Sequence, residues 1–197
     1  MSQIALPLAA GQGAGPSRIV AGKANAGVLD AFAHAEGWPF RTAILLGPPR
    51  SGKSLLARWF AEHNAGDVID DADTADETAL FHAWNRTQES GRPLLLVSNR
   101  ADWRVMLPDL GSRLGAALRL EIGAPDDAML ADLVALHAEL RGLALDESAA
   151  AYLVPRMPRS HIGVERLVAA IDRLSLERKQ APTLSIWRDA LDAISGS

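Results

Sequence analysis

One segment of the chain has the residue types and the spacing of a phosphate-binding loop. Residues 47–54 read Gly-Pro-Pro-Arg-Ser-Gly-Lys-Ser, which fits the pattern G-x-x-x-x-G-K-S/T. In such a loop the glycines let backbone N–H groups turn inward around a phosphate, and the following helix adds the positive end of its dipole. We expect the phosphates to be bound by Gly47, Pro49, Arg50, Ser51, Gly52, Lys53 and Ser54.

Two side chains of this loop have distinct chemical roles. Lys53 would neutralise the β- and γ-phosphate oxygens, and the Ser54 hydroxyl would hold Mg²⁺. The alternative is a Gly/Pro-rich turn with a solvated lysine. A strand-like apolar run directly before the loop and an amphipathic helical pattern directly after it favour the phosphate site.

Polar side chains follow the next two strand-like segments. We expect Asp70 to bind Mg²⁺ through water and Asp71 to polarise an attacking water. The alternative is that these acids cap the next helix, which is the role we expect for Asp73. Asn99, within Ser98-Asn99-Arg100, would point at the γ-phosphate or the attacking water, unless this segment is only a strand-ending turn.

These residues need a parallel sheet to bring them together. Apolar runs predict strands over residues 42–46, 67–70, 93–98 and 117–122. Helical spacing predicts helices over residues 23–36, 54–63 and 74–89. The alternation of strand and helix indicates an α/β fold with a parallel sheet covered by helices. Trp38 stands at a break between two elements, where it could pack in the core or cover the nucleotide.

The strand signals stop after residue 123. Asp126 or Asp127 would cap a helix that runs to about Arg141, and Gly142 would end it. Further helices are predicted over residues 147–156, 160–179 and 184–194. We therefore predict a flexible uncharged arm over residues 1–17, a nucleotide-binding core over 18–123 and a small all-helical domain over 124–197.

Composition excludes several classes of protein. The 197 residues are 48% hydrophobic and 22% charged, with a net charge of −4 and no cysteine, so a disulfide framework, a thiolate zinc site and a cysteine nucleophile are excluded. No apolar run approaches the roughly 18 residues of a membrane span, and we expect no secretory signal. The negative charge argues against a broad, non-specific grip on nucleic acid. These features favour a cytoplasmic protein.

The order of the motifs resembles the AAA+ module of the DnaA family of bacterial replication initiators. The segments that carry the resemblance are GPPRSGKS, VIDDAD, ETALFHAWN, LLLVSNR and LPDLGSRL, within a match over residues 18–195. The resemblance implies an AAA+ P-loop core with a helical lid and bound ADP or ATP with Mg²⁺. Only 16 residues separate Lys53 from Asp70, so the extra edge strand and helix that the family has there do not fit.

The resemblance also implies roles for residues outside the loop. Val20 and Asn25 lie in a segment similar to the one that flanks the adenine, and Asn99 falls at sensor 1. Arg113 falls at the arginine finger, which acts in trans on nucleotide held by a neighbouring subunit. At sensor 2, where the family has an arginine, the match places Gly163 or Glu165, with Arg159 and Arg166 nearby.

Residues 3–8, Gln-Ile-Ala-Leu-Pro-Leu, resemble the peptide with which Hda-type members of this family dock on the sliding clamp of DNA polymerase III. The glutamine amide offers hydrogen bonds, the aliphatic side chains offer apolar anchors, and the proline limits the entropy lost on binding. We expect this contact to be made by Gln3, Ile4, Leu6, Pro7 and Leu8.

The resemblance implies a regulator of replication initiation more than a strong ATPase. The initiator's DNA-binding helix-turn-helix does not follow the predicted lid in this sequence, so we expect no direct DNA-binding domain. The expected partners are the clamp and the initiator DnaA, and the protein would promote hydrolysis of the ATP bound to the initiator. The resemblance is also compatible with a homo-oligomer. The alternatives are a self-contained oligomeric AAA+ ATPase and a binding scaffold that keeps its nucleotide for structure alone.

Overall fold

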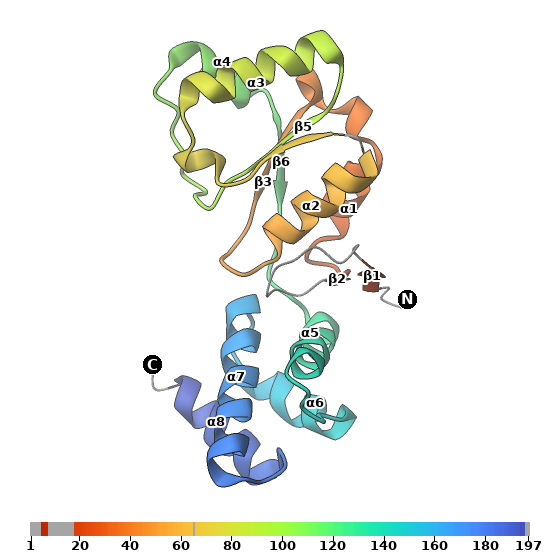
Figure 1. Ribbon diagram of the computed structural model, residues 1–197, viewed down its shortest axis with the longest axis vertical. Helices are drawn as coiled ribbons and strands as arrows, with labels where there is room; N and C mark the ends of the chain where they lie inside the picture. The colour runs from red at the N-terminus through yellow and green to blue at the C-terminus, as the bar shows by residue number, and fades with distance from the viewer. Residues whose placement is uncertain (1–4, 8–17, 65, 196–197) are drawn as a thin grey trace. The chain divides into compact units, whose positions relative to one another are not determined.

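The computed structural model describes residues 5–7, 18–64 and 66–195 (Figure 1). Contacts divide the chain into two compact units, and each is described by itself. The α/β unit is Asn25–Gly123, and the helical unit joins the described residues of Met1–Ala24 to those of Ala124–Ser197. Arg18–Ala24 thus groups with the C-terminal helices. No helix in the described ranges has the length and apolar character needed to cross a membrane.

The α/β unit is built on a parallel sheet of four strands. The strands are β3 (Thr42–Leu46), β4 (Asp67–Ile69), β5 (Leu94–Val97) and β6 (Leu118–Glu121). Their order is β4-β5-β3-β6, and every neighbouring pair is parallel. All five residues of β3 are buried, as expected of an apolar run between two other strands. The four predicted strands are confirmed, with ends that differ by at most one residue.

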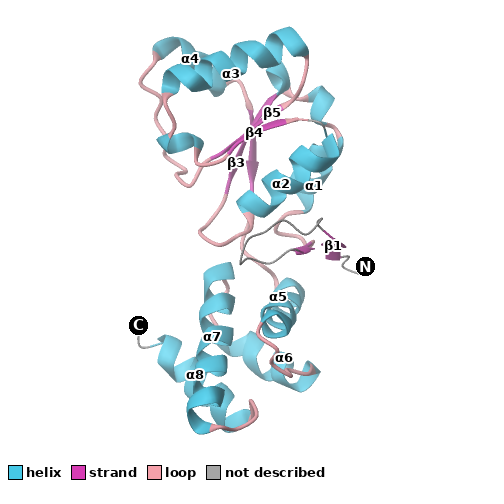
Figure 2. Ribbon diagram, viewed as in Figure 1, coloured by secondary structure: helices cyan, strands magenta, loops and turns pink. Residues whose placement is uncertain are grey.

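Helices cover both faces of this sheet (Figure 2). They are α1 (Ala26–Ala33), α2 (Lys53–Asn64), α3 (Glu77–Ser90) and α4 (Pro108–Gly115), with 3₁₀ turns η1 (Ala35–Gly37), η2 (Pro39–Arg41) and η3 (Ala72–Thr74). Ile44 and Leu46 of β3 pack in one core cluster with residues of α3 and α4. Because side chains alternate along a strand, Ala43 and Leu45 face the opposite layer. Since α2 ends at Asn64 and β4 begins at Asp67, no further strand separates them, and the predicted loss of an edge strand is confirmed.

An aromatic cluster fills the core beneath α1 and α2. Phe32, Trp38 and Phe60 are each at most 5% exposed. The Trp38 ring stacks on Phe60 at 5.2 Å between ring centroids, and its indole N–H donates to the Ala31 carbonyl at 2.9 Å. Trp38 is therefore a core residue, and the alternative in which it covers the nucleotide is wrong.

Helix α4 was not predicted from the sequence. Its signals are a proline at the first helical position, Pro108, and apolar residues four apart, Leu110 and Leu114. Both leucines are buried in the core cluster that contains Ile44 and Leu46. The helix has only eight residues, so the apolar spacing repeats once and gives a weak helical signal.

The described part of the helical unit contains four α-helices, each of which was predicted. They are α5 (Asp127–Leu140), α6 (Glu147–Leu153, continued by the 3₁₀ turn η4, Val154–Arg156), α7 (His161–Arg178) and α8 (Leu184–Ser195). Asp126, Asp146 and Ser160 cap α5, α6 and α7, and each side chain accepts a backbone N–H three residues further on. Gly142, with φ of +67°, follows the end of α5, a position that favours glycine.

A small two-stranded ribbon belongs to the helical unit. Strand β1 (Ala5–Pro7) pairs antiparallel with β2 (Arg18–Val20), so that Leu6 lies opposite Ile19. The Arg18 guanidinium forms an ion pair with Glu139 of α5, which ties β2 to the helices. Neither strand was predicted from the sequence.

Candidate nucleotide-binding site

The predicted phosphate loop and acids lie at the same edge of the sheet. The loop joins the carboxyl end of β3 to α2, Asp70 directly follows β4, and Asn99 lies just beyond β5. In a parallel sheet these strand ends meet at one edge, where open α/β folds bind their ligands. The fold thus brings together residues that lie up to 52 positions apart.

The backbone of the phosphate loop requires its glycines. Gly52 has φ of +86°, a conformation that side-chain-bearing residues rarely adopt. At Gly47 an added Cβ would lie 3.0 Å from both the Ile122 Cβ and the Ser51 Oγ, closer than ordinary contact allows. Arg50 also has a positive φ of +63°. The loop backbone is therefore closely folded, and a larger residue at position 47 or 52 would be strained.

Lys53 points into this loop. Its ammonium donates to the Gly47 carbonyl at 2.9 Å and to the Pro48 carbonyl at 3.1 Å, and the residue is 6% exposed. Burial lowers the pKa of Lys53 below its usual 10.5, and the nearby carboxylates of Asp70 and Asp71 partly offset this. Among the described residues the ammonium donates hydrogen bonds to neutral carbonyls alone, so it would gain from an anionic acceptor.

Ser51 supplies an independent sign that the loop fits a polyphosphate. Its hydroxyl is buried and has no hydrogen-bond partner among the described residues, and such groups are rare in folded proteins. Within the same loop, Lys53 offers the positive charge. The donor set therefore suits the phosphates of a nucleotide.

The acids at the ends of β4 and β5 form a connected network. The Asp71 backbone is in the left-handed region, with φ of +51° and ψ of +38°. Its carboxylate accepts a hydrogen bond from the Asn99 side-chain amide at 2.5 Å. The Asn99 backbone N–H donates to Asp73 at 3.0 Å, and the Asp71 N–H donates to Asp70 at 3.0 Å. The predicted association of Asp70, Asp71 and Asn99 at one place is thus present.

Asp73 does not cap the following helix, and that expectation was wrong. The α3 cap is Asp76, whose carboxylate accepts the Ala79 N–H at 2.9 Å. Asp73 lies in the preceding 3₁₀ turn, where it holds the backbone of Asn99 instead.

A magnesium ion at this edge would need the nucleotide to complete its ligands. Ser54 stands in the first turn of α2, and both it and Asp70 are exposed. Within the described part of the chain, no group of three or more histidine or acidic residues is placed to hold a metal. Mg²⁺ prefers waters and phosphate oxygens with only one or two protein ligands, which this pair could supply.

Arg113 is held by α3. Its guanidinium lies 4.3 Å from the ring centroids of both Phe81 and Trp84, and its Nη1 donates to the Asn85 side-chain oxygen at 2.5 Å. These three partners were not predicted from the sequence. Their i, i+3, i+4 spacing, which places them on one face of a helix, was the available signal.

Glu77, at the start of α3, was also missed. Its two carboxylate oxygens accept the backbone N–H groups of Met106 and Leu107 at 2.8 and 2.6 Å. These residues directly precede α4, so Glu77 fixes the start of the helix that carries Arg113.

The remaining predicted residues lie in several places. Val20 belongs to β2 and packs against the core of the helical unit, whereas Asn25 is buried just before α1. Leu6 and Pro7 lie in β1. The other predicted clamp residues, Gln3, Ile4 and Leu8, lie outside the described residues.

The start of α7, where the resemblance places sensor 2, leaves no room for a side chain at Gly163. An added Cβ would lie 2.9 Å from the Pro158 carbonyl oxygen. The nearby Arg159 pairs with Asp127 at 2.6 Å. Position 163 is therefore constrained to glycine by packing.

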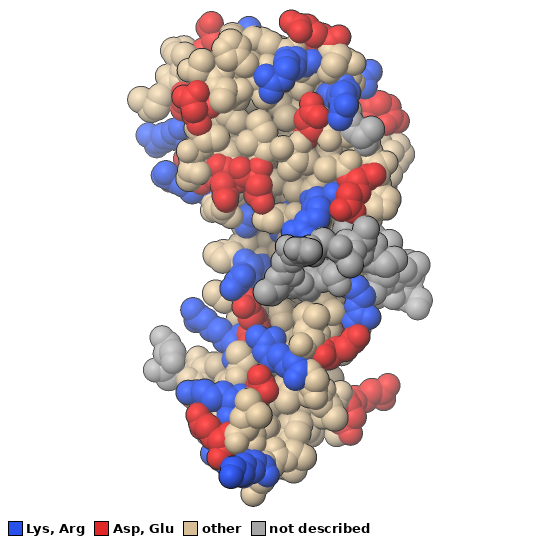
Figure 3. Space-filling model, in the orientation of Figure 1, with Lys and Arg blue, Asp and Glu red and all other residues tan. Residues whose placement is uncertain are grey.

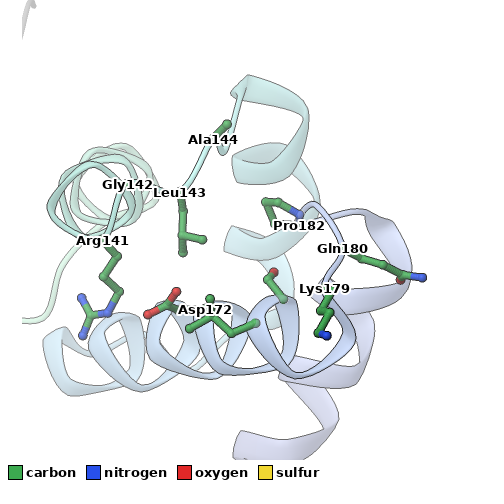
Figure 4. Close-up of a pocket in the computed structure, with 10 residues that line it drawn as sticks. Arg141, Gly142, Leu143, Ala144, Asp172, Lys179, Gln180 and Pro182 are labelled. Carbon is green, nitrogen blue, oxygen red and sulfur yellow. The ribbon is translucent and has the colours of Figure 1, made fainter.

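The helical unit has a hollow of its own (Figure 4). It measures about 500 Å³ and lies between the turn after α5 and the C-terminal half of α7. Arg141, Asp172 and Lys179 line it together with the apolar Leu143 and Leu176. Because its lining mixes both charges with apolar groups, it indicates no ligand class.

Acidic and basic side chains are interspersed over the face drawn in Figure 3. This agrees with the net charge of −4. A broad single-sign field of the kind that binds a phosphate backbone is not seen on that face.

Comparison with known proteins establishes the fold. No family model matches the sequence. The chain is similar to domain III of the DnaA replication initiation protein of Thermotoga maritima, with a TM-score of 0.70 and 16% identity over 89% of this chain and 94% of that one. It is also similar to the RuvB Holliday junction branch migration motor of Thermotoga maritima, with a TM-score of 0.63 and 19% identity over 87% and 69% of the two chains.

A third similar structure is the AMPPCP-bound DnaA of Aquifex aeolicus, with a TM-score of 0.59 and 16% identity over 82% of this chain and 66% of that one. At these identities the likeness shows the fold. The chain has the α/β AAA+ fold, with a parallel sheet of four strands and flanking helices.

Proposed function

We propose that this protein is a DnaA-related regulator of replication initiation that binds ADP or ATP with Mg²⁺. In this proposal it docks on the sliding clamp and promotes hydrolysis of ATP bound to the initiator DnaA. The observation that carries the nucleotide part is the loop between β3 and α2. There the buried Lys53 ammonium and the buried Ser51 hydroxyl, which has no hydrogen-bond partner among the described residues, belong to one short segment.

The phosphates would replace interactions that the loop now makes with itself. Lys53 would exchange two neutral carbonyls for phosphate oxygens, and a charge-assisted hydrogen bond is roughly twice as strong as a neutral one. Ser51 would gain the partner that it lacks. Nucleotide binding is therefore favoured by groups that are already in place.

The role in trans rests on Arg113 and on the resemblance to the initiator. An arginine supplied to the triphosphate of another subunit neutralises charge that develops on the phosphate oxygens during hydrolysis. Arg113 lies near the C-terminal end of α4 and is partly exposed. Docking through residues 3–8 would raise its local concentration near clamp-bound partners.

A binding titration with a fluorescent ADP analogue tests the nucleotide site. Lys53→Ala should weaken binding by at least about tenfold, because a charge-assisted hydrogen bond contributes roughly 1.5–3 kcal/mol. Arg58→Ala, an exposed change on the same helix, is the matched control and should bind normally. Equal affinity of the Lys53 variant and the wild type would reject this site.

An initiator ATPase assay with clamp loaded on DNA tests the regulatory role. Arg113→Ala should retain nucleotide and clamp binding but lose the stimulation, whereas Arg86→Ala, on the exposed face of α3, should retain it. Deletion of residues 1–8 should abolish clamp binding and leave nucleotide affinity unchanged. Normal stimulation by the Arg113 variant would refute the role in trans, and clamp binding by the deletion variant would refute the docking peptide.

A self-contained ATPase is the second possibility that an observation favours. The hydrogen bond between Asn99 and Asp71 is of the kind that orients a carboxylate toward an attacking water. Steady hydrolysis by the purified protein, lost in Asp71→Asn and retained in Arg113→Ala, would support this function over the regulator.

A further inference from the structure

Among the described residues, the side chains that hold the Arg113 guanidinium all come from helix α3. The Phe81 and Trp84 rings each lie 4.3 Å from its guanidinium carbon, and Asn85 accepts a hydrogen bond from its Nη1 at 2.5 Å. We call Phe81, Trp84 and Asn85 the α3 cage. Aromatic faces attract a guanidinium through their negative π-surface, and they leave its charge intact.

The α3 cage leaves part of the guanidinium available. A cation–π contact attracts the positive charge of the guanidinium and uses none of the five N–H donors that an arginine carries. Among the described residues only Asn85 accepts from these donors. The other donors lie in the same plane and suit a pair of anionic oxygens, as in a phosphate.

Helix α3 also fixes the backbone that carries Arg113. Glu77 binds the two N–H groups before α4, and Trp84 packs against Phe40 at 6.1 Å between ring centroids. One rigid helix thereby sets both the start of α4 and the orientation of the arginine side chain. An arginine side chain that rotates freely loses rotamer entropy when it binds a partner, and an arginine that is already held in place loses less.

We propose that Phe81, Trp84 and Asn85 are positioning residues that hold Arg113 ready for the triphosphate of a partner ATPase. This inference rests on the proposed role of Arg113 in trans. A purely structural α3 cage would stabilise the α/β unit without affecting catalysis. An α3 cage that stores the arginine away from the partner would slow catalysis until it opened.

The test is the stimulated hydrolysis of initiator-bound ATP, measured against the concentration of this protein. Trp84→Leu and Phe81→Leu should each lower the maximal rate by about 3- to 10-fold, the effect of losing one cation–π contact in a partly desolvated setting. The concentration for half-maximal stimulation should stay the same, because docking is unaffected. Trp84→Phe and Phe81→Tyr keep an aromatic face and should restore most of the rate, and Arg86→Ala is the neutral control.

A second measurement reports on the α3 cage without any partner. The Nε–H resonance of Arg113 should be shifted by the ring currents of the two aromatic rings, and Trp84→Leu should reduce this shift while Trp84→Phe preserves it. Normal thermal unfolding of each variant shows that the unit remains folded.

The outcomes separate this inference from the function on which it rests. If Arg113→Ala stimulates normally, the role in trans fails, whatever the resonance shows. If Arg113→Ala is inactive but folded leucine variants of the α3 cage keep the full maximal rate, or exceed it, the positioning inference is overturned. A lower maximal rate with recovery in the aromatic variants supports it.

Discussion

The substitution Gly52→Ala separates the conformational requirement of the phosphate loop from its packing. Gly52 has φ of +86°, and an added Cβ would meet no heavy atom within 4 Å. The variant is thus penalised by backbone conformation alone. Gly91 offers a matched control, because it has φ of +70° at the end of α3 and its added Cβ would meet only Arg41 Nε at 3.9 Å.

The expected loss of stability is the same at both positions. An alanine in the left-handed region costs about 1–2 kcal/mol, and the stiffer unfolded chain returns about 0.4–1 kcal/mol. The net effect is about 1 kcal/mol, which lowers the Tm of a unit of roughly 100 residues by about 4–8 °C. Thermal unfolding followed by tryptophan fluorescence measures this, because four of the five tryptophans lie in the α/β unit.

The two variants should differ in nucleotide affinity. If the backbone at position 52 relaxes toward negative φ, the N–H groups of the loop and the adjoining Lys53 move away from the phosphates. Loss of one charge-assisted hydrogen bond, about 1.5–3 kcal/mol, weakens binding by about tenfold or more. A titration with fluorescent ADP should show this loss for Gly52→Ala and wild-type affinity for Gly91→Ala. Equal affinities with equal Tm losses would refute the assignment of this loop as the phosphate site.

Three further changes test other parts of the structure. Burial lowers the pKa of Lys53 in the free protein, and bound phosphate would raise it. Nucleotide affinity should therefore be full below the lowered pKa and should fall as the pH rises through it, beginning below the usual 10.5. A Kd that does not change with pH up to 10.5 would contradict this expectation. Gly163→Ala places a Cβ 2.9 Å from the Pro158 carbonyl oxygen and should destabilise the helical unit by about 1–3 kcal/mol in urea unfolding, and an unchanged midpoint would show that α7 shifts freely. Asp126→Ala removes the cap of α5 and should cost about 1 kcal/mol, whereas Asp126→Asn keeps an acceptor and should cost little; equal losses in the two variants would exclude the cap as the cause.

The sheet and the phosphate loop could be predicted because their signals are local. The run Thr42–Leu46 is apolar throughout, and the loop that follows it has fixed glycine positions. The caps of α5 and α7 were predictable for the same reason, since Asp126 and Ser160 immediately precede helical patterns.

The surroundings of Arg113 could not be predicted in this way. They depend on how α3 packs against α4, and α4 itself has only two buried apolar residues, Leu110 and Leu114. Asp73 shows a related difficulty, because several acids precede α3 and only the three-dimensional turn decides that Asp76 becomes the cap. The β1–β2 ribbon consists of three-residue strands, which are too short to show alternation.

The parallel sheet has two open edges, at β4 and β6, and both are poor templates for another strand. Strand β4 has three residues and begins at Asp67, which pairs with Arg92 at 3.1 Å. Strand β6 has four residues, of which Arg119 and Glu121 are charged and exposed. Short, charged edges resist the backbone pairing that leads to aggregation. Association by strand addition is therefore disfavoured at both edges, and partners of this unit would have to engage its helices and loops through side chains, where a single substitution can alter specificity.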